Sequence, residues 1–290
     1  MISIIAIPSV SLGDAGEASF SFTRIGVGSR PSALAEAMTA AGGDVNSAFY
    51  NPSLLNTLSS RNQVAFMYNT YLEDNHQSYL AAATRRSDYA VGAYLILGGV
   101  SDFERRVGPT PEPEGMFDEN YFIGALTYAR KLGNIDLGIS GKYAYEKIDY
   151  QSASSMMFDA GISGRVNEEI TLGAALKNIG TEPKFDSTSF PLSQEYRIGA
   201  AYKPIFFQQY LELMVDGVFY SDIDPKYNLG AEYNYKNYFT LRTGYGIGYE
   251  SRSLSFGGGV TYRQFAFDYA FVGFKNDLGN THRFTLLANF

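Results

Sequence analysis

The chain has 290 residues, a formal net charge of −7 and no cysteine. Hydrophobic residues make up 45% of it, but its mean hydropathy is −0.15, because apolar residues are spread among polar ones. No apolar run approaches the roughly 18 residues that a membrane-spanning helix needs, so a helical membrane protein is excluded. The negative charge argues against nucleic acid as a partner. The 23 Tyr, 21 Phe and 30 Gly residues favour strands that bend or crowd one another.

The first residues, Met1 to Pro8, are apolar and resemble the hydrophobic part of a secretory signal whose positively charged start is missing. No small-x-small cleavage site follows them. Two interpretations stay open, a signal remnant or a hydrophobic tail. We therefore set residues 1–24 apart as a signal remnant or N-terminal tail.

Residues 25–58 carry the helical spacing of the chain. Ser32 follows Pro31 and is a plausible N-cap, and Gly42-Gly43 stops the run. The apolar residues at helical spacing in between are Ala33, Leu34, Ala37, Met38 and Ala41. The spacing predicts a helix over this run.

A second short helix is expected from Asp44 or Asn46 to Tyr50, where Asn51-Pro52 breaks it. Neither helix is long enough to be stable alone in water. Both must therefore pack against another part of the chain.

From Asn62 onward the hydrophobic pattern has a period of two, which indicates strands with two different environments. In the last strand, Phe284 and Leu286 fall on one face, and Arg283 and Thr285 fall on the other. We predict about fourteen strands, near residues 62–71, 77–85, 88–99, 119–130, 134–148, 153–165, 169–177, 194–203, 209–220, 226–235, 237–249, 252–262, 264–273 and 281–290.

The polar faces of these strands carry charges of both signs at mid-strand. The ones that we expect to line a lumen are Asp136, Lys142, Asp159, Arg197, Asp216, Arg242 and Asp268. Alternation alone does not separate a membrane barrel from a soluble β-sandwich. Two features favour the barrel: tyrosines gather at strand ends, as in an aromatic girdle, and short connections alternate with long ones.

We therefore predict an all-β fold, a transmembrane antiparallel β-barrel of about 14 strands over residues 59–290. Its lumen is wider than that of an eight-stranded barrel, which side chains can fill. Residues 25–58 are the expected N-terminal plug. The partners expected of such a barrel are outer-membrane lipid and the barrel-assembly machinery.

The chain ends on Phe290, which resembles the closing strand of bacterial outer-membrane barrels. We take Phe284 and Phe290 as the assembly signal. An even number of strands predicts that the N and C termini are both periplasmic, with residues 25–58 entering the barrel from below. The predicted location is the bacterial outer membrane.

A family likeness is carried by two adjacent stretches. Gly26 to Ala40 is similar to the GxRxxxMGxAxxA start of the PorV/PorQ-like outer-membrane proteins, and Ala41 to Leu55 is similar to their DDxxAxxxNPAgL continuation. That class is related to the FadL long-chain fatty-acid transporters. Ser53 replaces the usual Ala, and Leu34 stands where Met is common. The chain is also shorter than typical fatty-acid transporters.

The resemblance implies a fourteen-stranded barrel with an N-terminal plug. The PorV/PorQ branch implies a role beside the type IX secretion apparatus, with secreted or surface proteins or other secretion components as partners. The FadL branch implies transport of a hydrophobic small molecule. An apolar pocket between plug and wall, or a kinked strand, would favour transport; a sealed lumen of paired charges would favour secretion.

The residues of the plug motif are Gly26, Arg30, Pro31, Asp44, Asn46, Asn51 and Pro52. Arg30 needs an acidic partner, because buried charges must be paired, and Asp159, Asp216 or Asp268 could supply it. Asn51-Pro52-Ser53 is either a functional hatch element or a break that positions the plug.

The sequence does not predict an enzyme. His76 beside Glu73 and Asp74 is the candidate for a Ser-His-acid site, but this stretch is also typical of a polar hairpin turn. The chain has no Cys and no His pair for a metal site, and we expect no cofactor.

Overall fold

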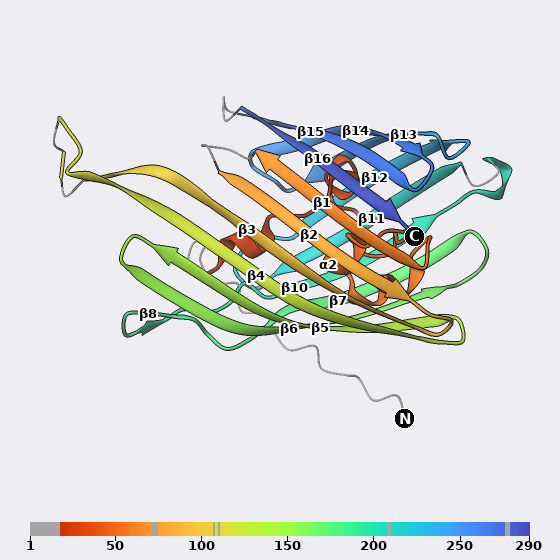
Figure 1. Cartoon of the computed structure of the whole chain (residues 1–290), viewed down its shortest axis with the longest axis horizontal. Helices are drawn as coiled ribbons and strands as arrows, with labels where there is room; N and C mark the ends of the chain where they lie inside the picture. Colours follow the sequence, from red (N-terminus) through yellow and green to blue (C-terminus); the bar gives the residue numbers. More distant parts are fainter. Residues whose placement is uncertain (1–17, 71–74, 107, 110, 208–209, 276–278) are drawn as a thin grey trace.

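The structure is a computed structural model that describes residues 18–70, 75–106, 108–109, 111–207, 210–275 and 279–290. Among these residues, fourteen strands close into an antiparallel barrel, and β1 pairs with β16 to complete the ring (Figure 1). The barrel strands are β1 (Asn62–Thr70), β2 (His76–Arg85), β3 (Tyr89–Arg105), β4 (Gly115–Leu132), β5 (Ile135–Ile148), β6 (Gln151–Arg165), β7 (Ile170–Gly180), β10 (Glu195–Tyr202), β11 (Leu211–Tyr220), β12 (Lys226–Tyr235), β13 (Phe239–Ile247), β14 (Arg252–Tyr262), β15 (Phe265–Phe274) and β16 (Asn280–Asn289). The predicted fold class is confirmed.

Burial along the strands is the reverse of that in a soluble protein. On β5, Ile139 is 62% exposed, whereas Ser140 is 2% and Lys142 is 5% exposed. On β16, Phe284 and Leu286 face outward, and Arg283 faces the interior. Apolar side chains thus cover the outside of the wall and polar ones line the inside, as in a barrel that lies in lipid. In the described part of the chain, no helix is long and apolar enough to cross a membrane.

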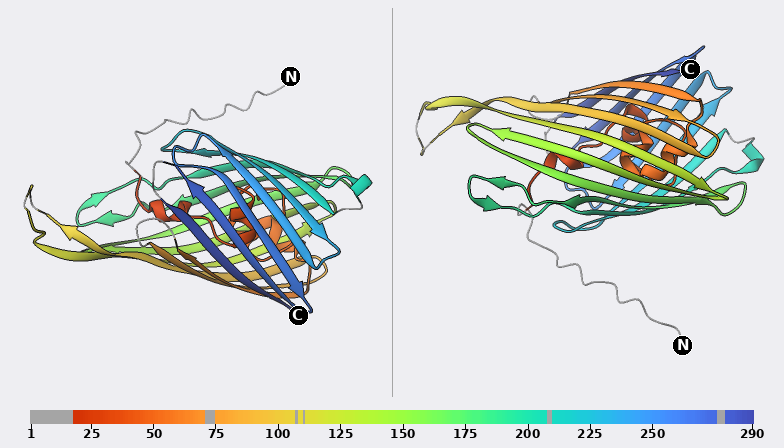
Figure 2. Two further views of the ribbon diagram at one scale, coloured as in Figure 1. Left: turned by 90° about the horizontal axis from the view of Figure 1, so that it is seen from above. Right: turned by 60° about the horizontal axis from the view of Figure 1, so that its bottom comes forward.

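Two strands are longer than the sequence predicts. β3 and β4 were expected over residues 88–99 and 119–130, but their pairing continues past a bulge to Arg105 and Gly115. The extension projects beyond the rest of the barrel (Figure 2). Phe103 and Phe117, which face each other on it, stack with ring centroids 5.3 Å apart. The expected loop over residues 100–118 is therefore largely a ribbon, because these two aromatic rings support pairing outside the barrel.

The barrel has two unlike rims. At one, the short-turn rim, brief turns join β2 to β3, β4 to β5 and β6 to β7. At the other, the long-connection rim, β3 meets β4, and a longer connection with a two-stranded ribbon, β8 (Lys184–Phe185) and β9 (Thr188–Ser189), leads from β7 to β10. The segment after Pro204, too long for a tight turn, holds a short 3₁₀ helix, η3 (Ile205–Phe207).

The chain enters the barrel at the long-connection rim. Ser19 forms a parallel bridge with Leu192, and Arg24 makes an ion pair of 3.0 Å with Asp222. The expectation that residues 25–58 enter from the short-turn end is therefore wrong, because these two contacts hold the start of the segment at the opposite rim. Phe290 lies at the short-turn rim, where its N–H donates to the carbonyl of Asn62. Residues 1–17 of the predicted N-terminal tail lie outside the described residues.

Residues 25–58, here called the inner segment, are packed inside the barrel (Figures 1 and 2). Its helical pieces are α1 (Ser29–Ala33), α2 (Ser47–Tyr50) and the 3₁₀ helix η2 (Pro52–Thr57), preceded by η1 (Ser21–Arg24). The helix predicted from Ser32 to Ala41 does not form: α1 ends at Ala33, because Ala35 and Glu36 take left-handed backbone angles. Ser32 is therefore inside α1 rather than its N-cap.

Candidate functional site

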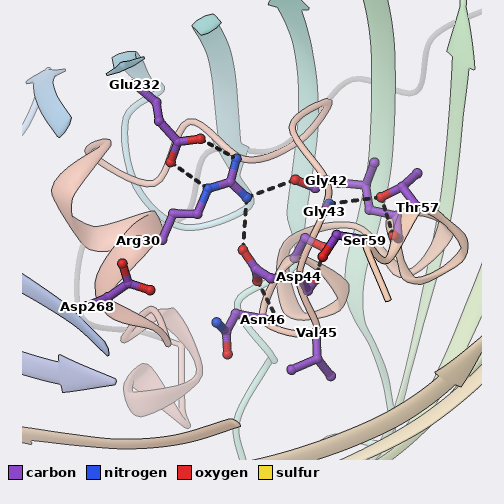
Figure 3. A network of polar contacts seen from close by, with 12 residues as sticks. Arg30, Gly42, Gly43, Asp44, Val45, Asn46, Thr57, Ser59, Glu232 and Asp268 are labelled. Atoms are coloured by element: carbon purple, nitrogen blue, oxygen red, sulfur yellow. Dashed lines mark hydrogen bonds and ion pairs between the residues drawn. The ribbon is translucent and has the colours of Figure 1, made fainter. Parts of the chain in front are cut away.

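Arg30, at the start of α1, is the centre of the polar contacts that hold the inner segment (Figure 3). Its Nε donates to Oε2 of Glu232 at 2.8 Å, and its Nη1 donates to Oδ2 of Asp44 at 2.9 Å and to the carbonyl of Gly42 at 2.8 Å. Nη2 reaches Oε2 of Glu212 at 3.5 Å. Burial opposes the charge of Arg30, but these carboxylates raise its pKa well above the ordinary value. Arg30 thus joins the inner segment to itself and to the wall.

The wall continues this network from strand to strand. Glu232 on β12 also accepts from Arg242 on β13, and Arg242 reaches Asp268 on β15. Glu212, directly opposite Glu232 in the sheet, pairs with Lys203 at 3.4 Å. Glu212, Glu232 and Asp268 therefore each form an ion pair with a basic side chain, as buried charges require.

A second network lies around Thr39 and Arg197. Asp216 accepts both from the backbone N–H and from the hydroxyl of Thr39, at 2.9 and 2.6 Å. Arg197 donates to Asp216 at 3.0 Å, to Glu195 at 2.8 Å and to the backbone carbonyl of Glu36 at 2.6 Å. The inner segment is thus held to β10 and β11 through main-chain groups that have no partner within a helix.

Glu36 forms a separate anchor. Its carboxylate accepts two hydrogen bonds from Arg252 on β14, at 2.9 and 3.1 Å. Burial alone would favour the neutral acid, but Arg252 reverses this and lowers the pKa of Glu36 to about 2. The left-handed angles at Ala35 and Glu36 turn the chain so that this side chain meets the wall.

The Asn51-Pro52-Ser53 motif fixes the other half of the inner segment. Asn51 Nδ2 donates to the carbonyls of Thr39 and Ile162, and its Oδ1 accepts from the N–H of Ser53. The hydroxyl of Ser53 donates to Ser163 on β6. The motif therefore caps η2 and attaches it to the wall.

Glycines of the wall make room for this close approach. A Cβ at Gly138 on β5 would collide with the backbone of Pro52 and Ser53, and one at Gly173 on β7 would collide with the carbonyl of Thr39. The other wall glycines whose Cβ would meet the inner segment are Gly92, Gly161, Gly199, Gly230, Gly244 and Gly257. The inner segment thus lies directly on main chain, where any side chain would displace it.

Aromatic rings close the lumen toward the long-connection rim. Phe22 of η1 stacks on Tyr121 of β4 with ring centroids 4.6 Å apart. Phe49 of α2 packs edge-on against Tyr94 of β3. The ammonium of Lys177 lies 4.3 Å from the centroid of Phe49. In each contact, η1 or α2 supplies a Phe ring, and the wall supplies a Tyr or Lys side chain that has an apolar stem and a polar end.

The predicted lumen charges are all on the inner wall, but their partners differ from those expected. None of the three aspartates proposed for Arg30 contacts it: Asp159 pairs with Lys142 at 2.6 Å, Asp216 with Arg197, and Asp268 with Arg242. Asp136 accepts from Asn56 of η2. The expectation for Arg30 was wrong because Asp44 and Glu232 are nearer in the folded chain, and pairing across a barrel leaves no mark in sequence spacing.

The remaining motif residues form hydrogen bonds through their own backbone groups. The carbonyl of Gly26 accepts from Arg283, the carbonyl of Pro31 accepts from the N–H of Glu36, and the N–H of Asn46 donates to Asp44. Glu212 and Glu232 were expected among the charges on the polar strand faces, whereas Glu36 and Arg252 were not predicted as site residues. The signal of Glu36 was a charge inside an apolar run, and that of Arg252 was a charge at the start of a strand.

Two grooves open on the outer wall, and a polar cavity lies between the inner segment and the short-turn rim. A groove of about 360 Å³ near the long-connection rim runs over β2 to β5 and includes Gly98 and Tyr121. A notch of about 390 Å³ lies near the short-turn rim on β5 to β7. The polar cavity, about 350 Å³, extends from Gly42 and Thr57 to the short turns.

His76, the candidate for a Ser-His-acid site, is exposed at the start of β2, and its expected partners Glu73 and Asp74 lie outside the described residues. His282 Nδ1 lies 2.8 Å from the hydroxyl of Tyr269. Among the described residues, no group of His, Cys, Asp and Glu could hold a metal ion.

No protein-family model and no curated protein matches the chain, but solved structures do. The Ralstonia pickettii toluene transporter TbuX matches with a TM-score of 0.68 at 12% identity, over 91% of this chain and 98% of its own. The Pseudomonas putida toluene transporter TodX matches with a TM-score of 0.66 at 11% identity, over 91% and 96%. A Pseudomonas aeruginosa FadL homologue matches with a TM-score of 0.59 at 11% identity, over 91% and 98%.

The chain has the FadL-type barrel fold. The FadL-related, fourteen-stranded part of the predicted resemblance is confirmed at the level of fold. The PorV/PorQ assignment finds no support in these matches. The identities, at 11 to 12%, extend the likeness to the fold and no further.

Proposed function

We propose that this protein is an outer-membrane channel for hydrophobic small molecules, and that the inner segment is its plug. The fold shared with two toluene transporters supports this function. So does the apolar outer wall, which suits a barrel surrounded by lipid. The ring closes between β1 and β16, and in an outer-membrane barrel the short turns would face the periplasm.

The observation that carries the proposal is the contact between wall and plug at Tyr121. This residue lines the apolar groove on the outside of the wall, yet its ring faces inward and stacks on Phe22. Gly98, opposite Tyr121 in the sheet, lets this ring lie directly on the wall backbone, since a Cβ at Gly98 would collide with the ring. In this proposal a hydrophobic molecule crosses the wall between β3 and β4, where the ladder loses its register between Val100 and Phe103, and displaces the Tyr121–Phe22 stack without passing through the polar centre of the plug.

Uptake by whole cells tests this route. A Gram-negative host expressing the chain would be given a radiolabelled monoaromatic hydrocarbon or a radiolabelled long-chain fatty acid. Ser78→Phe fills the outer groove from β2 and should lower uptake, whereas Thr243→Phe, outward on the opposite wall, should not. No uptake above the empty-vector host would refute the channel. Uptake by Ser78→Phe equal to that of the unchanged chain would refute the wall route.

A second function is favoured by the projecting β3–β4 ribbon. We propose, as the alternative, that this ribbon binds a secreted or surface protein, as the PorV/PorQ likeness implies. Arg105, the last residue of β3, pairs with Asp149 and lies 5.0 Å from the centroid of Tyr150, so the ribbon is braced against the turn between β5 and β6. Replacing residues 101–118 by an Asn-Gly turn would then lower the amount of surface-exposed protein in the native host while hydrocarbon uptake is retained.

A further inference from the structure

The notch near the short-turn rim is the second of the two openings described on the apolar outer wall. It exists because Gly164 on β6 and Ala174 on β7 face outward among larger side chains. The larger residues around it are Ile135, Ile162, Val166 and Leu172, all of them exposed. Its volume, about 390 Å³, is within the roughly 300–1,000 Å³ of small-molecule sites. The notch is open to the lipid side of the wall.

Two arginines flank this notch. Arg165, the last residue of β6, lines both the notch and the polar cavity below the plug. Arg130 is on the outer face of β4, in alternation with the exposed Leu126 and Tyr128. It lies opposite Leu137, which lies opposite Ile162, so two strand spacings of about 5 Å separate Arg130 from the notch.

Neither arginine has an acidic partner in the described part of the wall. Over these ranges, no ion pair forms to Arg130 or Arg165. A cation on the lipid-facing side of a barrel is costly at mid-membrane but not near an interface. At the end of the strands, lipid phosphates can pair with such a cation from the notch side, while Glu168 and Glu169 share the polar cavity that Arg165 also lines.

We propose that the notch binds an anionic phospholipid of the leaflet at the short-turn rim. One acyl chain fills the space over Gly164, and the phosphate lies between Arg165 and Arg130. The apolar floor and the paired cations select a ligand with both an alkyl chain and a negative head group. The inference rests on the membrane-spanning part of the proposed function and is independent of transport.

Lipid retention by the purified full-length protein tests the site. The detergent-solubilised barrel is titrated with phosphatidylglycerol or with phosphatidylethanolamine of the same acyl chains, and bound lipid is counted by native mass spectrometry. Gly164→Leu fills the notch; a Cβ there would lie 3.4 Å from the carbonyl oxygen of Asn134 and 3.6 Å from Ile135, so the barrel accepts it. Gly141→Leu is the matched control, outward on β5 with its nearest neighbour 3.9 Å away.

The expected result is loss of the tightest phosphatidylglycerol site in Gly164→Leu and its retention in Gly141→Leu. Arg165→Gln and Arg130→Gln should each reduce the preference for phosphatidylglycerol over phosphatidylethanolamine about fivefold, because each surface cation contributes about that factor. These two variants leave the notch unfilled and report on charge alone. Retention by Gly164→Leu, equal loss in Gly141→Leu, or an unchanged lipid preference in both arginine variants would overturn the proposal. Hydrocarbon uptake does not enter this measurement, so failure here leaves the channel proposal standing.

Discussion

Replacing Arg30 by Met should release the plug while the barrel stays closed. The side chain of Met keeps the apolar packing of the arginine stem but removes the charge. Glu232 would still pair with Arg242, and Glu212 would still pair with Lys203. Asp44 has no other cation among the described residues, so its carboxylate would be left buried and unpaired.

Removing one partner of a buried ion pair costs about 3 to 5 kcal/mol. At about 1.4 kcal/mol per factor of ten, the open population of the plug should rise at least about a hundredfold. Amide hydrogen exchange of peptides over residues 29–46, followed by mass spectrometry, measures this directly. Exchange on β6 and β7 should not change, because those strands are held by the barrel ladder.

The double variant Arg30→Met, Asp44→Asn is the decisive control. The amide of the second substitution would keep the shape of the side chain without leaving a charge, so protection of residues 29–46 should recover in part. Two results would refute the reasoning: protection in Arg30→Met equal to that of the unchanged chain, or no recovery in the double variant. The first would mean that Arg30 does not hold the plug, and the second that its role is packing rather than charge.

Three further changes test other contacts of the plug. Gly138→Ala should displace η2 and raise hydrogen exchange at residues 52–57, whereas Gly141→Ala on the same strand should not; equal exchange in both would show that the wall glycines are not needed. Because the pKa of Glu36 is lowered to about 2, its anchor is fully present above about pH 4.5 and is lost as the pH falls toward 2. Glu36→Gln should remove on the order of 3 kcal/mol of this pH-dependent stability, seen as a flatter acid titration of plug exchange; an unchanged titration would contradict the anchor. Phe290→Ala should reduce the yield of barrel in the outer membrane without lowering the melting temperature of the assembled protein, and a normal yield would rule out the terminal Phe as an assembly signal.

The wall of this protein was largely predictable, and so was the position of residues 25–58 inside it, but the conformation and contacts of this inner segment were not. The wall obeys a local rule, since a residue such as Ile139 or Lys142 faces outward or inward by its position in a period of two. The fourteen strands and the inward charges followed from that rule. The extension of β3 to Arg105 did not, because it depends on a pairing between Phe103 and Phe117 across a loop.

The plug depends on contacts between residues far apart in sequence. Arg30 meets Glu232 after a separation of 202 residues, and no periodicity marks such a pair. The apolar run from Ala33 to Ala41 predicts a helix, but the wall replaces helical hydrogen bonds with its own: Asp216 accepts the N–H of Thr39, and Arg197 donates to the carbonyl of Glu36. Tertiary contacts thus override local propensity in this segment.

The two strands that close the barrel, β1 and β16, are also joined to the inner segment. Gln63 on β1 accepts from the N–H of Val45 through Oε1, and its Nε2 donates to Asn289 on β16 and to the carbonyl of Gly43. One side chain therefore bridges the two strands that close the ring and the segment inside it. The backbone of the inner segment also occupies spaces that exist only because the facing wall residues are glycine. Such a close fit suits a wall that closes around the segment better than a barrel that is closed before the segment enters. Seating of the inner segment and closure of the ring are therefore coupled through the side chain of Gln63.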